Sequence, residues 1–155
     1  MPDKAATIGQ LEADYARFRG KFAELPEDAW EEIWLGEWNL SQLLAHMGGW
    51  FKEMTGAMER VARGERPTPE GVDYSDADSW NAKFAATASP GKAAIATFDL
   101  RFKEYANAAQ ALPEDLYGEK DGRPKIGNRL LDASGLHHFA EHEPQLDQWL
   151  EARKG

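Results

Sequence analysis

The 155-residue chain contains no cysteine. The fold therefore cannot depend on disulfides, a cysteine nucleophile is excluded, and any sulfur chemistry needs a thiol from outside the protein. Basic residues are also scarce: 18 lysines and arginines against 27 acids give a formal net charge of −9. Such a balance argues against a phosphate backbone as partner, so we expect no nucleic-acid binding.

Long apolar runs are missing as well. Charges interrupt the sequence every few residues, so we expect neither a signal segment nor a membrane-spanning helix, and we expect a cytoplasmic protein without a membrane partner. The chain has no G-x-S-x-G motif and no glycine-rich phosphate loop. No stretch shows the apolar–polar alternation of a half-buried strand.

Helical periodicity is what the sequence has in abundance. Apolar residues recur at spacings of three and four, and the pattern predicts helices from about Thr7 to Leu25, Asn39 to Arg63, Ser89 to Leu112, and Asn128 to the C-terminus. The apolar content of 42% and the length suit one globular domain over residues 1–155.

The connection between the second and third helices sets the topology. Residues 64–89 are too many for a tight antiparallel turn and include a predicted short helix near residues 76–84. A crossover of this length lets the third helix run parallel to the second. We therefore predict an all-α four-helix bundle with up-down-down-up order.

Two helix starts carry local signals. Asn39 with Gln42 three residues later forms a capping-box pattern, and Trp38 is placed to pack on Leu43 as a hydrophobic staple. Ser89-Pro90 puts serine at a helix cap and proline at the first helical position, where its missing N–H has no consequence. These signals predict where the second and third helices begin.

Three histidines are the candidate functional residues: His46, His138 and His142. Neutral imidazole is the commonest protein ligand for first-row divalent metals. At about 100° per residue, His138 and His142 lie about 40° apart on the core-facing side of the last helix, whereas His137 points away. His46 lies at the edge of the apolar stripe of the second helix. The alternative is that each is a core histidine satisfied by hydrogen bonds, without a metal.

Two other metal-site patterns contain histidine, the di-iron pattern Glu-x-x-His and the inverted zinc-protease pattern H-x-x-E-H. A di-iron bundle needs Glu-x-x-His pairs, but the residues three positions before the histidines are Leu43, Gly135 and Phe139. A ferritin-like site is therefore excluded. The run from His138 to His142 matches the inverted zinc-protease pattern H-x-x-E-H, in which Glu141 would be the general base. That motif is short and frequent by chance, which disfavours a protease but leaves Glu141 as a candidate base or as a surface residue.

The combined pattern resembles a known family. Trp38, a polar cap, Leu-Leu-Ala-His46, then Gly-Trp50, and late in the chain His138-x-x-x-His142-x-x-Gln145, are similar to the DinB-like superfamily of four-helix bundles. Asp78-Ser-Trp-Asn81 and Asp115-Leu-Tyr-Gly118 resemble its ClbS/DfsB branch. The resemblance covers nearly the whole chain.

This resemblance implies a divalent metal, often nickel or zinc, held by His46, His138 and His142 at one end of the bundle. Members of the family include S-transferases and a maleylpyruvate isomerase that use low-molecular-weight thiols, and a hydrolase that inactivates an electrophilic genotoxin. Pro144 departs from the expected helix, because its ring removes one helical hydrogen bond just after His142.

The sequence thus favours a metal-dependent transferase or hydrolase acting on a small electrophile. Three imidazoles leave open metal positions where water or an external thiol can be activated as the nucleophile. Glu53 and Glu141 are the carboxylates nearest by helical position that could orient a ligand imidazole, and for Glu141 the sequence favours a plain surface position. Three tryptophans are expected to be pocket walls or core: Trp50, Trp80 and Trp149. The alternative is a non-catalytic bundle that binds a small molecule or a protein partner, and a homodimer remains open.

Overall fold

The computed structural model describes residues 3–154, which form a helical bundle. In chain order the elements are α1 (Lys4–Gly20), η1 (Glu27–Glu31), α2 (Leu40–Ala62), α3 (Ala77–Ala86), α4 (Ala93–Ala111), η2 (Glu114–Leu116), β1 (Glu119–Lys120), β2 (Arg123–Pro124), α5 (Ile126–Leu131), η3 (Asp132–Leu136) and α6 (His137–Lys154). Here η1 and η2 are 3₁₀-helices and η3 is a π-helix.

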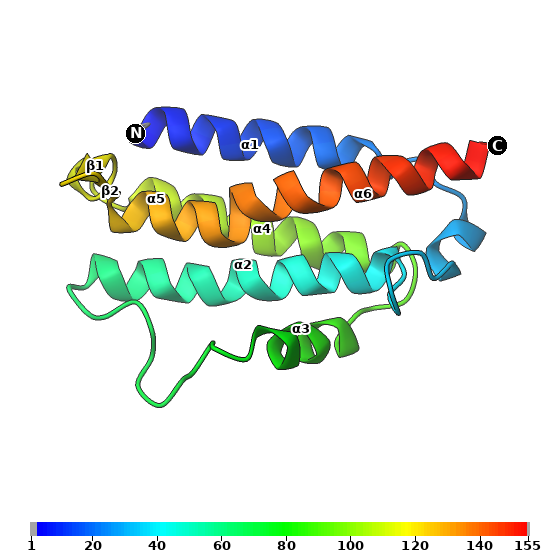
Figure 1. The fold of residues 1–155 in the computed structure, drawn as a ribbon, viewed down its shortest axis with the longest axis horizontal. Coiled ribbons are helices and arrows are strands. Elements are labelled where there is room, and N and C mark those ends of the chain that lie inside the picture. Colours follow the sequence, from blue (N-terminus) through cyan, green and yellow to red (C-terminus); the bar gives the residue numbers. More distant parts are fainter. Residues whose placement is uncertain (1–2, 155) are drawn as a thin grey trace.

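The four long helical segments of the bundle run in the predicted directions. Figure 1 shows α2 and α4 running in one direction, with α1 and the α5–η3–α6 segment running in the other. The long connection after α2 returns along the outside of the bundle and carries the predicted short helix α3, which lies beside α2. The all-α, up-down-down-up prediction is confirmed.

Two boundaries differ clearly from the sequence prediction. The first helix ends at Gly20 rather than Leu25, because the Lys21 N–H bonds to the Phe18 carbonyl and tightens the last turn. The third helix begins at Ala93 and not at Ser89-Pro90, because Gly91 adopts a φ of +58°, a left-handed conformation that cannot be part of an α-helix.

The structure also contains a short hairpin that the sequence did not predict. Strands β1 and β2 pair antiparallel over two residues each, around a turn in which Asp121 and Gly122 both have positive φ. Such a turn closes a tight hairpin. Strands of two residues are too short to show a measurable alternation.

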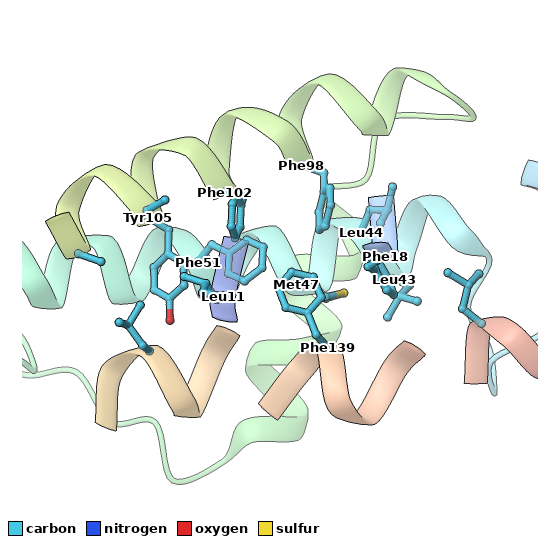
Figure 2. Close-up of a cluster of buried hydrophobic side chains, with 14 of the residues drawn as sticks. Leu11, Phe18, Leu43, Leu44, Met47, Phe51, Phe98, Phe102, Tyr105 and Phe139 are labelled. Atoms are coloured by element: carbon cyan, nitrogen blue, oxygen red, sulfur yellow. The ribbon is translucent and has the colours of Figure 1, made fainter. Parts of the chain in front are cut away.

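An aromatic core holds the four layers together (Figure 2). Phe51 of α2 lies at its centre and contacts rings from the other helices at centroid distances of 5.1–6.0 Å: Phe98, Phe102, Tyr105 and Phe139. Aromatic side chains bury large apolar areas, so they supply much of the driving force for folding. Phe139 stands between the two metal-ligand candidates of α6, and its burial directs this face of the helix inward.

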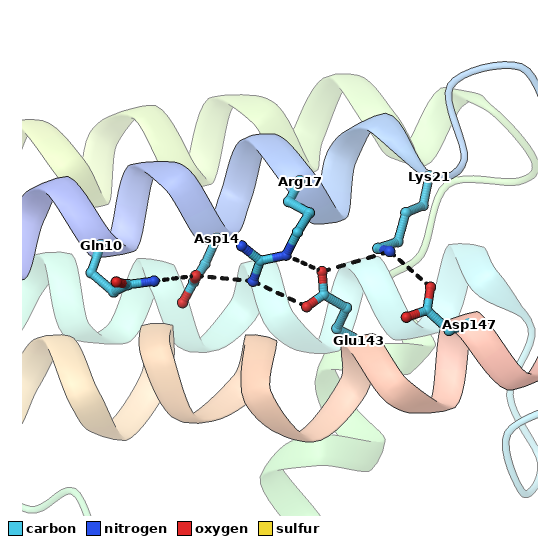
Figure 3. A network of polar contacts seen from close by, with 6 residues as sticks. All are labelled: Gln10, Asp14, Arg17, Lys21, Glu143 and Asp147. Carbon is cyan, nitrogen blue, oxygen red and sulfur yellow. Dashed lines mark hydrogen bonds and ion pairs between the residues drawn. The ribbon is translucent and has the colours of Figure 1, made fainter.

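A polar network joins α1 to α6 on the surface (Figure 3). Arg17 Nε lies 2.6 Å from Glu143 Oε1 and its Nη2 lies 3.0 Å from Asp14 Oδ1, while Lys21 Nζ lies 2.8 Å from Asp147 Oδ1. Each exposed pair contributes little stability by itself. Together they hold the α1 side of α6, opposite the face that carries the histidines.

In the part of the chain that the structure describes, no helix combines the length and apolarity needed to cross a lipid bilayer.

Candidate metal centre

The three candidate histidines meet in space. The ring centroids of His46 and His138 are 4.9 Å apart, those of His46 and His142 are 5.4 Å apart, and those of His138 and His142 are 5.7 Å apart. Their potential ligand atoms all lie within 4.8 Å of one another. All three residues are buried, whereas the side chain of His137 is 66% exposed. The predicted facing of the α6 histidines, with His138 and His142 inward and His137 outward, therefore agrees with the structure.

The position of His46 is set by the start of α2. The Asn39 side chain accepts from the Gln42 N–H at 3.0 Å, and Gln42 Oε1 accepts from the Asn39 N–H at 2.9 Å. This is the predicted capping box. Because it fixes where the helix begins, it also fixes the rotational phase that turns His46 inward. The indole of Trp38 lies 5.0 Å from the His46 ring, which leaves the imidazole between Trp38 and α6.

The two histidines of α6 are oriented by oxygen atoms of η3 and of α6 itself. His138 Nδ1 lies 2.7 Å from the Ser134 carbonyl, and His142 Nδ1 lies 2.7 Å from Gln145 Oε1. A carbonyl oxygen can only accept, so each Nδ1 carries the proton and each Nε2 keeps its lone pair free. This is the arrangement commonly seen for metal-binding histidines.

The π-helix η3 lies directly before His138. Its wider turn places the His137 N–H on the Asp132 carbonyl, five residues back. Gly135 within it is required by packing, because a Cβ there would lie 2.5 Å from Leu11 Cδ1. The α1 helix therefore approaches the wide turn closely, and the Ser134 carbonyl remains in reach of the His138 ring.

Two ring nitrogens at the centre of the cluster have no hydrogen-bond partner among the described residues: Nδ1 of His46 and Nε2 of His142. A buried polar atom left in this state costs about 1–3 kcal/mol. A metal ion would satisfy both lone pairs at once. Ligand nitrogens in a tetrahedral zinc site are about 3.4 Å apart, so small ring movements would bring the three imidazoles to ligand distance. The three histidines are therefore suited, in residue type and in spacing, to bind a divalent metal ion.

Burial keeps the rings of His46 and His138 neutral. Burial, aided by the neighbouring His138 and His142 and opposed by hydrogen bonding to Asn81, lowers the pKa of His46 to about 3. Burial likewise lowers the pKa of His138 to about 4, aided by His142 and opposed by the Ser134 carbonyl. Desolvation disfavours the imidazolium in both cases. Neutral imidazole is the form that binds a metal.

The histidines line a cavity of about 570 Å³ that opens to solvent between α2, α3 and α6. Trp38 and the turn before it form one wall, and Asp78 and Asn81 of α3 form another. Glu141 lies at the mouth, with Oε2 4.0 Å from His142 Nε2 and 3.6 Å from His137 Nε2. The arrangement leaves the centre accessible to a small molecule.

Neither of the two carboxylates orients a ligand imidazole, and the favoured expectation that Glu141 lies at the surface is confirmed by its 48% exposed side chain. Glu53 accepts a hydrogen bond from the Tyr74 hydroxyl at 2.8 Å and does not line this cavity. Glu141 lines it, but the Nδ1 atoms of the α6 histidines already face Ser134 and Gln145. The sequence did hold a signal for Gln145, which follows His142 by three residues and so lies one helical turn away.

None of the three tryptophans expected as pocket walls or core lines the histidine cavity, and Trp149 is part of the buried core. Trp149 stacks on Trp34 at 4.6 Å, and Trp50 donates its Nε1–H to Asn81 Oδ1 at 2.6 Å. Trp80 belongs to a second cavity. Trp38 takes the role instead, because the turn at residues 35–38 folds back over the start of α2.

Pro144 does not end the last helix, which runs unbroken from His137 to Lys154. The only backbone bond it removes within the helix is the one to the carbonyl four residues earlier. The irregularity lies instead before His138, in the π-helical turn.

The fold and the site together define a four-helix bundle with a buried three-histidine cluster at the floor of an open cavity. The family model of the DinB superfamily matches residues 10–146, so the chain belongs to that superfamily. Proteins of this superfamily typically bind a divalent metal, and the three-histidine group that could hold one is present here. No protein of curated function matches the chain significantly by sequence.

Solved structures share the fold along almost the full length. A protein from Streptococcus pneumoniae has a TM-score of 0.79 at 12% identity, covering 97% of this chain and 92% of its own. An uncharacterized protein from Clostridium difficile 630 has a TM-score of 0.78 at 10% identity, covering 97% of each chain. A structure described as the sibling lethal factor precursor DfsB has a TM-score of 0.78 at 15% identity, covering 99% of this chain and 98% of its own.

Proposed function

We propose that the protein is a divalent-metal-dependent transferase or hydrolase that acts on a small electrophile, and that it belongs to the ClbS/DfsB branch of the superfamily. The observation that carries the proposal is the pair of buried, unpartnered ring nitrogens on His46 and His142, at the floor of a cavity open to small molecules. Nickel or zinc suits a set of imidazole ligands.

His46, His138 and His142 are the proposed metal ligands. When bound, the metal supplies a Lewis acid that lowers the pKa of a water or thiol. Ser134 and Gln145 hold two of the rings in the tautomer that presents Nε2. Asn81 plays the corresponding part for the third ring, that of His46, to which it hydrogen-bonds. Trp50 in turn holds the Asn81 side chain by donating its Nε1–H to Asn81 Oδ1.

Glu141 is our candidate for the general base. It is the carboxylate at the cavity mouth within 4.0 Å of a ligand imidazole, and it is exposed enough to exchange the proton with solvent. The nucleophile comes from outside the chain, because the sequence contains no thiol. A thiol would make the reaction a transfer, and water would make it a hydrolysis.

Metal analysis tests the ligand assignment. We expect purified protein, reconstituted with Zn²⁺ or Ni²⁺ after chelator treatment, to bind one equivalent. His138→Ala and His142→Ala should lose it while circular dichroism shows that the helices persist. His137→Ala is the matched control and should keep the metal, because its side chain faces solvent. Equal loss in all three variants would contradict the proposed ligand set.

Activity separates catalysis from simple binding. Metal-loaded protein should accelerate either thiol addition to, or hydrolysis of, members of a panel of small electrophiles, and Glu141→Gln should slow that reaction without loss of metal. A transferase needs the added thiol, whereas a hydrolase turns over with water alone. Metal-loaded protein that accelerates neither reaction would support a non-catalytic bundle that binds a small molecule.

A further inference from the structure

A second cavity, of about 380 Å³, lies on the other side of α3 from the histidine cluster. It is enclosed by α2, α3 and α4. The two cavities share no lining residue: α3 presents Asp78 and Asn81 to the first, and Trp80, Lys83 and Phe84 to the second. Its volume falls within the range of small-molecule sites.

The floor of this second cavity is apolar, with contributions from Leu44, Phe84 and Phe98. Two consecutive glycines of α2 shape it. A Cβ on Gly49 would lie 2.3 Å from the ring of Phe84, and a Cβ on Gly48 would lie 3.5 Å from Arg101 Cγ. Glycine inside a helix costs about 1 kcal/mol relative to alanine, so Gly49 has a packing role: it lets α3 come close to α2, whereas a Cβ on Gly48 would make an ordinary contact with Arg101.

The rim carries three cations, Lys52, Lys83 and Arg101. In the described part of the chain neither lysine forms an ion pair, and Lys83 Nζ lies 4.8 Å above the Trp80 ring. Among residues 3–154, the one ion pair of Arg101 is a long contact of 3.9 Å with exposed Glu104.

The one acid of the lining is Glu53, and its carboxylate accepts the Tyr74 hydroxyl. A cluster of under-used cations around an apolar floor stands out in a chain of net charge −9. Its charge is complementary to an anion, and its floor is complementary to a hydrocarbon body.

We propose that this cavity binds a small amphipathic carboxylate. The hydrocarbon part lies against Phe84 and Phe98, and the carboxylate faces the cations of the rim. Burial of the apolar part contributes about 25 cal/mol per Å² removed from water, and charge-assisted hydrogen bonds from Lys or Arg add to the affinity. The site is separate from the proposed metal centre and does not depend on it.

Calorimetric titration with three eight-carbon probes tests the proposal. Octanoate should bind at least tenfold more tightly than octanol, octylamine should not bind detectably, and added NaCl should weaken octanoate alone, because salt screens the rim charges. Octanol binding as tightly as octanoate, or no detectable octanoate binding, would overturn the proposal.

Variants locate the site. The triple change of Lys52, Lys83 and Arg101 to Gln should weaken octanoate binding at least tenfold and leave octanol unchanged. A control triple with the same change in net charge, Lys103, Lys120 and Lys154 to Gln, alters residues that do not line the cavity and should bind octanoate as the natural chain does. Unchanged octanoate affinity in the first triple would refute the assignment.

Two further variants exclude indirect effects. Thr97→Trp adds bulk at the edge of the cavity and should abolish binding of both octanoate and octanol, with circular dichroism reporting that the fold is kept. His138→Ala should keep octanoate binding. Loss of octanoate in His138→Ala would place the ligand at the histidine cluster and overturn the second site, whatever the outcome of the metal analysis.

Discussion

Buried neutral histidines should make the metal-free protein sensitive to mild acid. The folded chain holds the pKa of His46 at about 3 and that of His138 at about 4, whereas an unfolded histidine has a pKa near 6.5. At pH 7.5 and above almost no histidine is protonated in either state, so the stability is fully present. As the pH falls through 6.5 towards the folded pKa values, only the unfolded chain takes up protons, and stability is lost.

Between the unfolded and the folded pKa values only the unfolded histidine takes up a proton, so the loss of stability there depends only on the pH and on the unfolded pKa. At pH 5.0 an unfolded histidine gains about 2 kcal/mol from protonation, and a folded ring that stays neutral gains almost none. His46 and His138 together should therefore lower the free energy of unfolding by about 4 kcal/mol between pH 7.5 and pH 5.0. That is a large part of the stability of a typical domain.

Urea unfolding of chelator-treated protein at the two pH values measures this loss. Other groups also titrate, so the comparison is between variants. His46→Gln should show a pH-dependent loss smaller by about 2 kcal/mol than the natural chain, whereas the exposed control His137→Gln should show the same loss as the natural chain. If His46→Gln retains the full pH dependence, burial does not keep the His46 ring neutral and the electrostatic argument fails. Saturating zinc should raise stability at pH 7.5 much more than at pH 5.0.

Three other changes test the structure around the site. Gln145→Leu removes the oxygen that faces His142 Nδ1 and should weaken zinc affinity about 10- to 100-fold in a chelator competition. An unchanged zinc affinity would refute the proposal that Gln145 positions the His142 ring. Gly49→Ala places a Cβ 2.3 Å from an aromatic ring of α3 and should cost about 1–3 kcal/mol in urea unfolding, whereas Gly20→Ala meets no neighbour and should cost no such amount. Asn39→Ala removes the capping box and should cost about 1 kcal/mol, most of which Asn39→Ser should restore.

Much of the bundle could be predicted because its helices are amphipathic and locally signalled. The capping box at Asn39 defined the start of α2, and the length of the crossover defined the parallel α2–α4 pair. The spacing of His138 and His142 was enough to place both rings inward and His137 outward, since residues four apart share a face. Whether the three rings bind a metal stays a prediction.

Other features depended on tertiary contacts or on backbone angles that residue types do not specify. A serine and a proline suggested a cap at residue 89, but the positive φ of Gly91 delays the helix. Helical position suggested Glu53 as a partner of the imidazoles, but Tyr74, reached only through the crossover, binds it instead. Trp38 as a pocket wall depends on a turn that folds back, which periodicity does not report.

The π-helical turn has a consequence for comparing this protein with its relatives. A π-turn corresponds to one residue more than an α-helix needs to cover the same length, so Leu131 and His138 stand in registers that differ by one position. An alignment drawn through this helix without a gap against a chain that lacks the extra residue would set exposed His137 in the column of a ligand. One gap between residues 131 and 138 restores the match. The ligand pair is thus better traced through the superfamily by its own four-residue spacing than by its distance from the residues that precede it.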